Sequence, residues 1–230
     1  MQENIIQIKK TLKLNFKDSG WDGILNPFLD SKAFDSITDK LSYLVEQDRR
    51  FTPKFKDAFN PFKETNLNDL KVVIVSQDPY PHLGVSDGLA FSCSNTSEIE
   101  KSLQYILKEI TGRTEFTSEE CNLARWAHQG VLLINTSFTC EINKIGSHQS
   151  IWKAFAEYVF DCINKKDKNI IFVLMGRKAE SWQLLLNGQI ILTCPHPASA
   201  AYNNDVWNAD GIFKKINKEL DMQGKTCISW

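Results

Sequence analysis

The chain has 230 residues, 42% of them hydrophobic, which is enough for one full core and predicts a single domain over residues 1–230. Its net charge is −1 and its pI about 6.4, so no general positive field marks it as a nucleic-acid-binding protein. No apolar run approaches the ~20 residues of a membrane helix, and Met1–Lys10 is too polar for a signal peptide. We expect a cytoplasmic protein without a membrane segment, or a nuclear one in a eukaryotic or viral host.

The predicted elements alternate along the chain. The first ~60 residues are expected to form a helical, loop-rich wrap, with one helix at Ile37–Val45. Four short β-branched-rich runs then predict strands buried on both faces: Lys71–Val75, Val131–Ile134, Ile170–Met175 and Ile190–Cys194. Apolar spacing predicts helices at Ile99–Ile110, Ile151–Ile163 and Ala209–Leu220, and a helix start at Thr117 before Thr117–His128. This order predicts a three-layer α/β/α fold with a mainly parallel, four-stranded central sheet.

The six cysteines show neither a C-x-x-C pair nor metal-site spacing. They are Cys93, Cys121, Cys140, Cys162, Cys194 and Cys227. Mostly buried, reduced thiols are therefore expected.

Each predicted strand ends in a polar or glycine-containing loop. Asp78 follows the first strand, Asn135 the second, Arg177 the third and His196 the fourth. In open parallel sheets, ligands bind beyond the carboxyl ends of the strands, so these four side chains should share one rim.

Each of these residues also has a structural interpretation. An Asp before Pro79 is common turn chemistry, His196 lies between two prolines, and Asn135 can satisfy local backbone groups. Phe91 would by default belong to the core. The shared placement of the polar residues is what favours an enzyme site.

Several common catalytic motifs are absent from the sequence. It contains no phosphate-binding glycine loop, no G-x-S-x-G elbow and no H-E-x-x-H pair, so we expect no cofactor and no metal. An Asp, a His and an amide in such a cleft suggest hydrolysis, with the Asp orienting water and the His stabilising a leaving anion.

The segment Val72–Tyr80 together with Gly88–Ser92 closely resembles the first motif of family 1 uracil-DNA glycosylases. Gly130–Asn135, followed by Thr139 and Ser147-His148, is similar to the second block of that family, and Ile191–Pro197 to the start of its last block. The resemblance spans roughly Phe51 to Phe213.

The resemblance implies an enzyme that flips uracil out of DNA and cleaves its N-glycosidic bond. Asp78 would stabilise the positive sugar and orient water, and His196 would donate a hydrogen bond to uracil O2. Asn135 would pair with O4 and N3–H, Phe91 would stack on the base, and Tyr80 would exclude a methyl group at C5. Gln77 would shape the pocket largely through its backbone.

The resemblance further implies DNA contacts and, as a second partner, a protein inhibitor that mimics DNA; a monomer is expected. The DNA contacts would fall at Pro81, Ser102, Gly176, Arg177, Ser199 and Ala200. Several of these positions depart from the family pattern. The family inserts a Leu wedge after its His-Pro, where this chain has Ala200, and Val206 or Trp207 is an alternative wedge.

These departures lead to a hypothesis that the protein prefers single-stranded or loosely paired uracil, with Arg177 offsetting part of the loss by pairing with a phosphate. Three other functions stay open. They are a non-catalytic DNA-binding or replication-accessory protein, a glycosylase for another modified base, and an unrelated α/β hydrolase.

Overall fold

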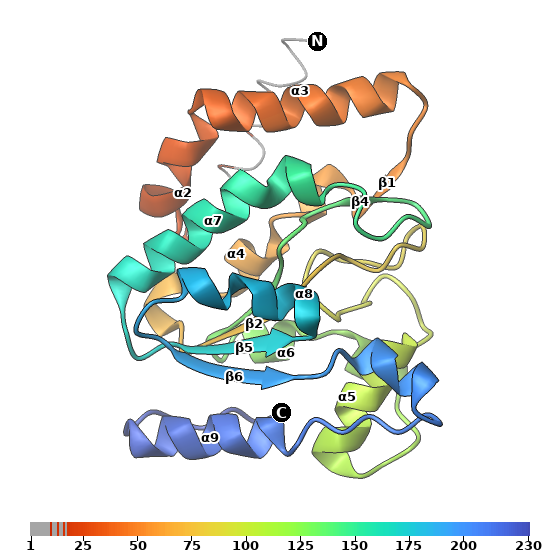
Figure 1. Ribbon diagram of the computed structural model, residues 1–230, viewed down its shortest axis with the longest axis vertical. Coiled ribbons are helices and arrows are strands. Elements are labelled where there is room, and N and C mark those ends of the chain that lie inside the picture. Colours follow the sequence, from red (N-terminus) through yellow and green to blue (C-terminus); the bar gives the residue numbers. More distant parts are fainter. Residues whose placement is uncertain (1–9, 11–12, 14–15, 17) are drawn as a thin grey trace.

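A parallel four-stranded sheet forms the centre of the computed structural model, which describes Lys10, Lys13, Phe16 and residues 18–230 (Figure 1). Its strands are β2 (Val72–Ser76), β3 (Val131–Asn135), β5 (Ile171–Met175) and β6 (Ile190–Cys194), in the spatial order β3-β2-β5-β6. All three pairings are parallel. The predicted sheet and strand positions are thus confirmed to within one residue at every end. The expected burial on both faces is wrong for β6, because it is an edge strand in which Ile190–Leu192 are partly exposed and Thr193 is exposed.

Helices cover both faces of the sheet. On one face lie α2 (Asp22–Leu29), α3 (Lys32–Glu46), α4 (Asn60–Glu64) and α7 (Gln149–Lys166), with α8 (Arg177–Glu180) and the 3₁₀ helix η4 (Ser181–Leu185). On the other lie α5 (Lys101–Thr111), α6 (Ala124–Ala127) and α9 (Ile212–Met222). The predicted α/β/α layering is therefore confirmed.

Alternate strand residues supply the two halves of the core. Val73, Leu132 and Phe172 pack with α7 and the N-terminal helices, whereas Ile74, Leu133 and Val173 pack with α5 and α9. Because side chains alternate across a strand, runs that are apolar at every position must be covered on both sides.

The helices α2 and α3 pack on α7. Phe28 and Phe34 contact Phe155, and Trp21 donates its Nε1–H to the Thr65 carbonyl at 2.8 Å. Predictions for Met1–Lys10 fall mostly outside the described residues, and the single-domain assignment stays a prediction. Among the described residues no helix is both long and apolar enough to cross a membrane.

The structure differs from the expectation at Thr117–His128. Thr117 and Glu120 form the expected capping box, but only a 3₁₀ turn η3 (Ser118–Cys121) follows, and α6 is separate. The backbone between them bonds to another loop: the Leu123 N–H donates to Ser92 Oγ, and the Cys93 N–H to the Cys121 carbonyl. These long-range bonds replace the helical ones, so a continuous helix is wrong, although Trp126 is buried as expected.

The remaining elements are short. The strands β1 (Phe51–Thr52) and β4 (Cys140–Glu141) form an antiparallel pair, and η1 (Phe55–Asp57), η2 (Leu67–Asp69) and η5 (Pro197–Tyr202) are 3₁₀ turns. All six cysteines are free thiols, four of them buried, which confirms the expected reduced state.

Candidate active site

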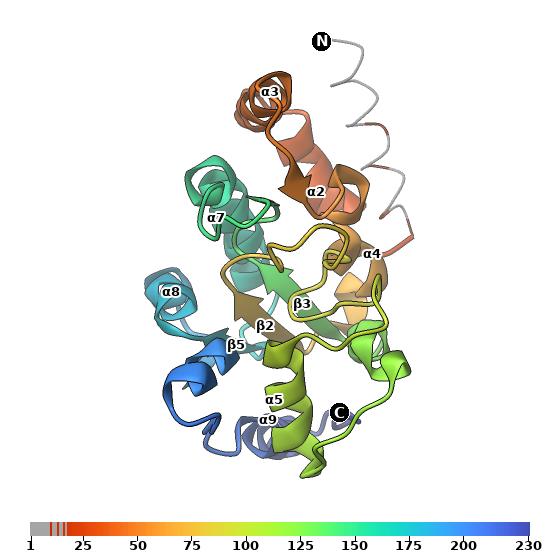
Figure 2. The same ribbon diagram turned by 90° about the vertical axis from the view of Figure 1, so that its right-hand side faces the viewer.

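The carboxyl ends of the four strands meet at one edge of the sheet, which faces the viewer in Figure 2. Ser76 ends β2 in register with Asn135 at the end of β3, and Met175 of β5 pairs with Cys194 of β6. The loops that carry Asp78 and His196 therefore start at the same edge, on two strands with β5 between them, and both residues line one pocket of about 480 Å³.

The pocket draws its lining from the loops after β2, β4 and β6 and from the start of α5. The lining residues are Ser76, Gln77, Asp78, Pro79, Tyr80, Pro81, His82, Phe91, Glu100, Lys101, Ser102, Ile145, His196 and Ala198. Among the described residues, no group of three or more His, Cys, Asp or Glu is arranged to hold a metal ion.

Asp78 presents one bonded and one free carboxylate oxygen. Oδ2 accepts hydrogen bonds from Gln77 Nε2 and, at 3.2 Å, from the Gly146 N–H. Oδ1 is buried and has no hydrogen-bond partner within the described structure. Burial raises the pKa of Asp78 above its ordinary value, although the hydrogen bonds from Gln77 and Gly146 act in the opposite direction. The Ser137 and Gln149 side chains also favour the charged form of this carboxyl, and Oδ1 is an acceptor that is open to a further donor.

The tautomer of His196 follows from its backbone. Its Nδ1 accepts the Ala198 N–H at 3.1 Å, and because an amide N–H can only donate, the neutral ring must carry its proton on Nε2. Burial lowers the pKa of His196, which favours this neutral form. The site therefore contains a neutral imidazole with a free Nε2–H donor.

Gly176 makes room for that imidazole. At its φ of +90°, a Cβ would lie 2.7 Å from the Cβ of His196, and its N–H donates to the Cys194 carbonyl at 2.8 Å. Gly176 is thus placed to support His196, and its N–H is already committed within the protein.

Phe91 and Tyr80 form the aromatic side of the pocket. The Phe91 and His196 rings lie 5.5 Å apart between centroids, with their planes inclined by 42°. Phe91 adopts a left-handed conformation with φ +66°, which is unusual for an aromatic residue, and its carbonyl accepts the Tyr80 hydroxyl at 3.1 Å.

Asp87 holds the turn that presents Phe91, and the sequence analysis misses it. Its buried carboxylate accepts hydrogen bonds from the Leu89 N–H, the Ser92 hydroxyl, and both the N–H and the hydroxyl of Ser94. An Asp followed by Gly and two nearby serines is the available sequence signal, since Asp side chains commonly bond to backbone N–H groups of the following residues.

The other candidate residues lie around this pocket at different depths. Asn135 is 3% exposed, and its Oδ1 has no partner within the described structure. Pro81 and Ser102 line the pocket mouth, and Arg177 is exposed at the start of α8.

The loop after β6 buries the last candidate, Ala200, and partly buries Ser199. Ala200 is fully buried, so its side chain has no surface to offer a DNA strand, and it cannot act as a wedge in this conformation. The Ser199 hydroxyl oxygen is buried without a partner in the described structure. Burial of Ala200 is favourable because the residue packs into the core beneath α5.

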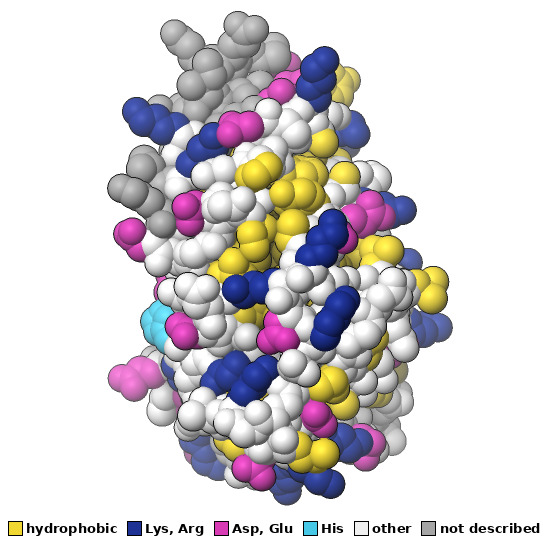
Figure 3. All heavy atoms as spheres, turned by 90° about the vertical axis from the view of Figure 1, so that its left-hand side faces the viewer, with side chains coloured by type: hydrophobic (Ala, Val, Ile, Leu, Met, Phe, Trp, Pro, Cys, Tyr) yellow, Lys and Arg dark blue, Asp and Glu magenta, His cyan; other side chains and the backbone are white. Residues whose placement is uncertain are grey.

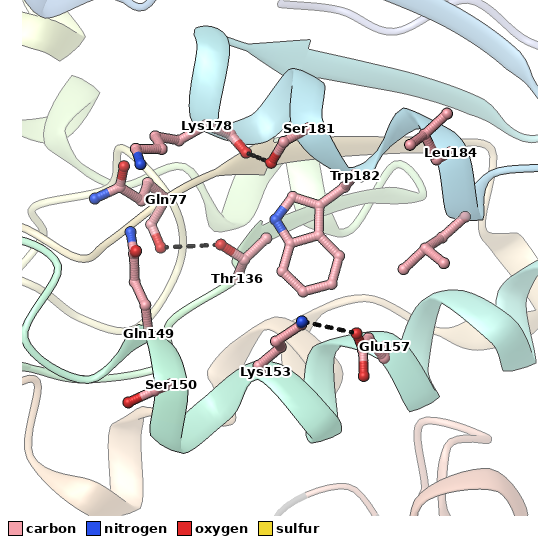
Figure 4. Close-up of a pocket in the computed structure, with 11 residues that line it drawn as sticks. Gln77, Thr136, Gln149, Ser150, Lys153, Glu157, Lys178, Ser181, Trp182 and Leu184 are labelled. Carbon is pink, nitrogen blue, oxygen red and sulfur yellow. Dashed lines mark hydrogen bonds and ion pairs between the residues drawn. The ribbon is translucent and has the colours of Figure 1, made fainter.

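A second hollow of about 520 Å³ lies on the other side of Gln77, between α7 and η4. Figure 4 shows Trp182 and Lys178 on one wall and Lys153 and Glu157 on the other. Figure 3 shows an apolar strip on that flank of the molecule, bordered by basic side chains. The hollow shares Gln77 with the pocket but contains neither Asp78 nor His196.

Comparisons with known proteins identify the family. The model of the Uracil DNA glycosylase superfamily matches residues 62–221, which is more than half of the chain. The chain belongs to this superfamily. A uracil-DNA glycosylase of Acinetobacter baumannii is 33% identical over 234 residues, covering 100% of this chain and 98% of that protein.

Solved structures of this superfamily match the fold as well. The mimivirus uracil-DNA glycosylase superposes with a TM-score of 0.84 at 26% identity, covering 99% of this chain and 92% of that one. A variant of the mimivirus protein in complex with UGI matches with the same TM-score and identity, covering 95% and 90%. The family resemblance that the first motif indicates is thus confirmed. It extends over nearly the whole chain.

Proposed function

We propose that the protein is a monofunctional, hydrolytic uracil-DNA glycosylase that releases free uracil from DNA and leaves an abasic site for base-excision repair. The observation that carries the proposal is the pocket that Asp78, Phe91 and His196 line together, with the Phe91 and His196 ring centroids 5.5 Å apart. The family membership supports the same activity.

Asp78 acts on the sugar side of the glycosidic bond. As that bond breaks, positive charge develops on the sugar, and an ionised carboxylate in a buried site stabilises it strongly. Oδ2 is held by Gln77 and Gly146, which leaves Oδ1 to bind and orient the attacking water.

His196 acts on the base side of the bond. The departing uracil gains negative charge on O2, and the Nε2–H of a neutral imidazole donates a hydrogen bond to that oxygen. The protein holds this proton on Nε2 through the Ala198 N–H, so no reorganisation is needed during the reaction.

Asn135 and Tyr80 determine which base is accepted. The Asn135 amide offers one donor and one acceptor, which match O4 and N3–H of uracil, whereas cytosine presents the reverse pattern and would leave buried groups unpaired. The Tyr80 ring, fixed by its hydroxyl bond to Phe91, occupies the side of the pocket where a thymine methyl group would lie.

Excision from defined oligonucleotides tests the proposal. The protein is incubated with strands that contain uracil, thymine, cytosine or a modified base at one position, and abasic sites are then cleaved with alkali. Cleavage at uracil alone is expected. Cleavage only at another base would show that this base, and not uracil, is the substrate. Binding without any cleavage would favour a non-catalytic DNA-binding protein.

DNA is the proposed partner, as a single or a double strand. The mimivirus variant in complex with UGI supports the further proposal that a DNA-mimicking inhibitor protein binds this protein. A monomeric state and a cytoplasmic location, or a nuclear one in a eukaryotic or viral host, stay predictions.

A further inference from the structure

The side chain of Gln149 lies outside the base pocket but close to the catalytic carboxylate. Gln77 lines both the pocket that contains Asp78 and the second hollow between α7 and η4, whereas Gln149 lines the second hollow and not the pocket. Figure 4 shows the side chains of Gln77 and Gln149 together at one end of that hollow. Gln149 thus has no place in the space that a base would enter, and it lies beside a residue that donates a hydrogen bond to Asp78.

The two glutamine amides converge on Gly146. At its φ of +83°, a Cβ on this glycine would lie 3.8 Å from Gln77 Nε2 and 3.9 Å from Gln149 Nε2. The Gly146 N–H donates to Asp78 Oδ2 at 3.2 Å, and Gln77 Nε2 donates to the same oxygen. Gln149 therefore belongs to a group of nitrogen donors that gathers around one carboxylate.

The start of α7 holds Gln149 in place. Gln149 is the first residue of this 18-residue helix, and its N–H donates to the Gly146 carbonyl at 3.4 Å. The preceding His148 is buried, and its Nδ1 pairs with Thr139 Oγ1 at 2.8 Å. Trp152 Nε1 donates to the same oxygen at 2.7 Å, so the first turn of the helix is tied to the segment before β4. A side chain on such a fixed backbone can hold a partner in one orientation.

Hydrogen bonds oppose the effect of burial on Asp78. Burial raises the pKa of this carboxyl above its ordinary value. The hydrogen bonds that lower the pKa come from Gln77, Gly146, Ser137 and Gln149. The Ser137 hydroxyl has a single proton, which it donates to a backbone carbonyl at 2.8 Å. The Gln149 amide has two N–H groups and can therefore add a donor that Ser137 does not.

Uncharged groups dominate the surroundings of Asp78. Burial raises the pKa of Cys140 to about 12 and that of Tyr80 well above 10. It lowers the pKa of His148 and of His196. The other ionisable side chains that line the two hollows are His82, Glu100, Lys101, Lys153, Glu157 and Lys178. None of these six is among the main influences on the pKa of Asp78, so its charge depends on hydrogen-bond donors rather than on a neighbouring ion.

We propose that Gln149 is a positioning residue for this reaction, whose amide keeps the Asp78 carboxylate charged and correctly oriented from the side of the second hollow. The inference rests on the proposed function, which needs an ionised Asp78. Gln149 touches neither the base nor the sugar and acts through Asp78 alone. With Oδ2 fixed by its donors, Oδ1 remains available for the attacking water.

The test compares Gln149→Ala and Gln149→Glu with the unchanged protein. The alanine variant removes the donor, and the glutamate variant keeps the shape but places a second carboxylate beside Asp78. Ser150→Ala and Ser150→Glu are the matched controls, because Ser150 is the next residue of α7, is exposed and lines the same hollow. For each protein, kcat and KM for uracil release from a single strand are measured between about pH 4 and 8.

Gln149→Ala should move the acid limb of kcat to higher pH by about one pH unit, because a hydrogen bond to a charged group is lost. Below that limb kcat should fall by about tenfold, whereas KM and the plateau should change by less than about threefold. Gln149→Glu should move the limb further, since a neighbouring carboxylate disfavours the charged form of Asp78. Both Ser150 variants should keep the original profile. A limb that stays in place in both Gln149 variants, with or without a lower plateau, would overturn the inference.

A titration that does not depend on activity separates this inference from the proposed function. With isotopically labelled aspartate, the carboxyl resonance of Asp78 reports its ionisation by nuclear magnetic resonance, and its loss in Asp78→Asn assigns it. The titration should move to higher pH in both Gln149 variants and stay in place in both Ser150 variants. An unmoved titration would refute the role of Gln149. A moved titration in a protein that releases no uracil would refute the proposed function alone.

Discussion

At the residue scale, Asp78 and His196 lie in similar, partly buried surroundings, but the reaction needs Asp78 charged and His196 neutral. Burial raises the pKa of the carboxyl and lowers that of the imidazole, since a buried site disfavours whichever form is charged. The reaction needs an ionised Asp78, so hydrogen bonds to Oδ2 must offset part of the cost of burial. It needs a neutral His196, which burial itself provides.

Replacing Asp78 by asparagine should separate chemistry from binding. The amide has nearly the same shape but no charge to stabilise the sugar, so kcat should fall by about 10²–10³-fold. DNA affinity, measured by fluorescence anisotropy, should stay close to that of the unchanged protein. Asp39→Asn on the exposed face of α3 is the control. Full activity in Asp78→Asn would remove this residue from the mechanism.

The dependence of kcat on pH should show an ascending limb in acid and no loss towards alkaline pH. Activity is lost as pH falls through the pKa of Asp78, which lies above 3.8, because the carboxylate becomes protonated. It is also lost as pH falls through the pKa of His196, which lies below 6.5, because the imidazole becomes charged. Tyr80 does not interfere, since burial raises its pKa well above 10.

The profile should therefore rise between about pH 4 and 6.5 and stay level to about pH 8. His196→Gln should keep only the Asp78 limb, with a lower plateau and a shallower slope. A decline in kcat between pH 6 and 8 would require a protonated His196 and would contradict the assigned tautomer.

At the scale of elements, the loop between β2 and α5 is organised by one carboxylate. Asp87 bonds to three residues that follow it, and its carbonyl accepts Asn60 Nδ2 from α4 at 2.6 Å. Gly88 lies so close to the Asp57 carbonyl that a Cβ would approach within 1.9 Å of that oxygen. The left-handed conformation of Phe91 is thus fixed by its surroundings.

Removing this carboxylate should loosen the base-stacking side of the pocket. Asp87→Ala leaves several buried donors unpaired and should lower the free energy of unfolding by about 2–4 kcal/mol, measured in urea. Inhibition by free uracil should weaken by about tenfold, since Phe91 loses its fixed position; Asp87→Asn, which keeps an acceptor, should recover part of both. Asp39→Ala is the surface control. A stability loss with unchanged inhibition by uracil would limit Asp87 to a structural role.

Elements defined by continuous patterns can be predicted from the sequence. The four strands can be, because residues such as Val72–Val75 must be buried on both faces. The two-residue strands β1 and β4 cannot be, since they are too short to carry a pattern. Thr117–His128 fails as one helix because its backbone bonds to Ser92 and Cys93, which are distant in sequence.

The same distinction applies to the candidate site. Asp78 and His196 share a pocket because parallel strands end at one edge, which is a property of the topology. The burial of Ala200 and the exposure of Tyr202 depend on a turn through Asn204 and Asp205. The hydrophobic periodicity of the sequence does not predict this turn. The position of a motif at the end of a strand therefore predicts which residues line the pocket better than it predicts which side chains of the surrounding loops are exposed.

At the scale of the whole molecule, apolar side chains gather where the strands end. Of the nine large hydrophobic side chains exposed among the described residues, four lie on loops beyond those ends: Leu83, Ile145, Tyr202 and Val206. Exposed cations border the same edge, with Lys101 at the pocket mouth and Arg177 and Lys178 on α8. Because the net charge is −1, the protein as a whole has no positive electrostatic field that would attract DNA. We therefore expect DNA to bind through the cations at this edge.

A small set of local phosphate contacts should give binding to DNA a modest salt dependence. Each cation that neutralises a phosphate contributes roughly 0.9 to the slope of log affinity against log salt. Replacing Arg177 and Lys178 together by alanine should lower that slope by about 2 and weaken binding equally for all flanking sequences. Lys214→Ala, an exposed cation on α9, should leave the slope unchanged. If Lys214→Ala lowered the slope as much as the double variant, binding would follow the net charge of the molecule, and the edge where the strands end would lose its special role.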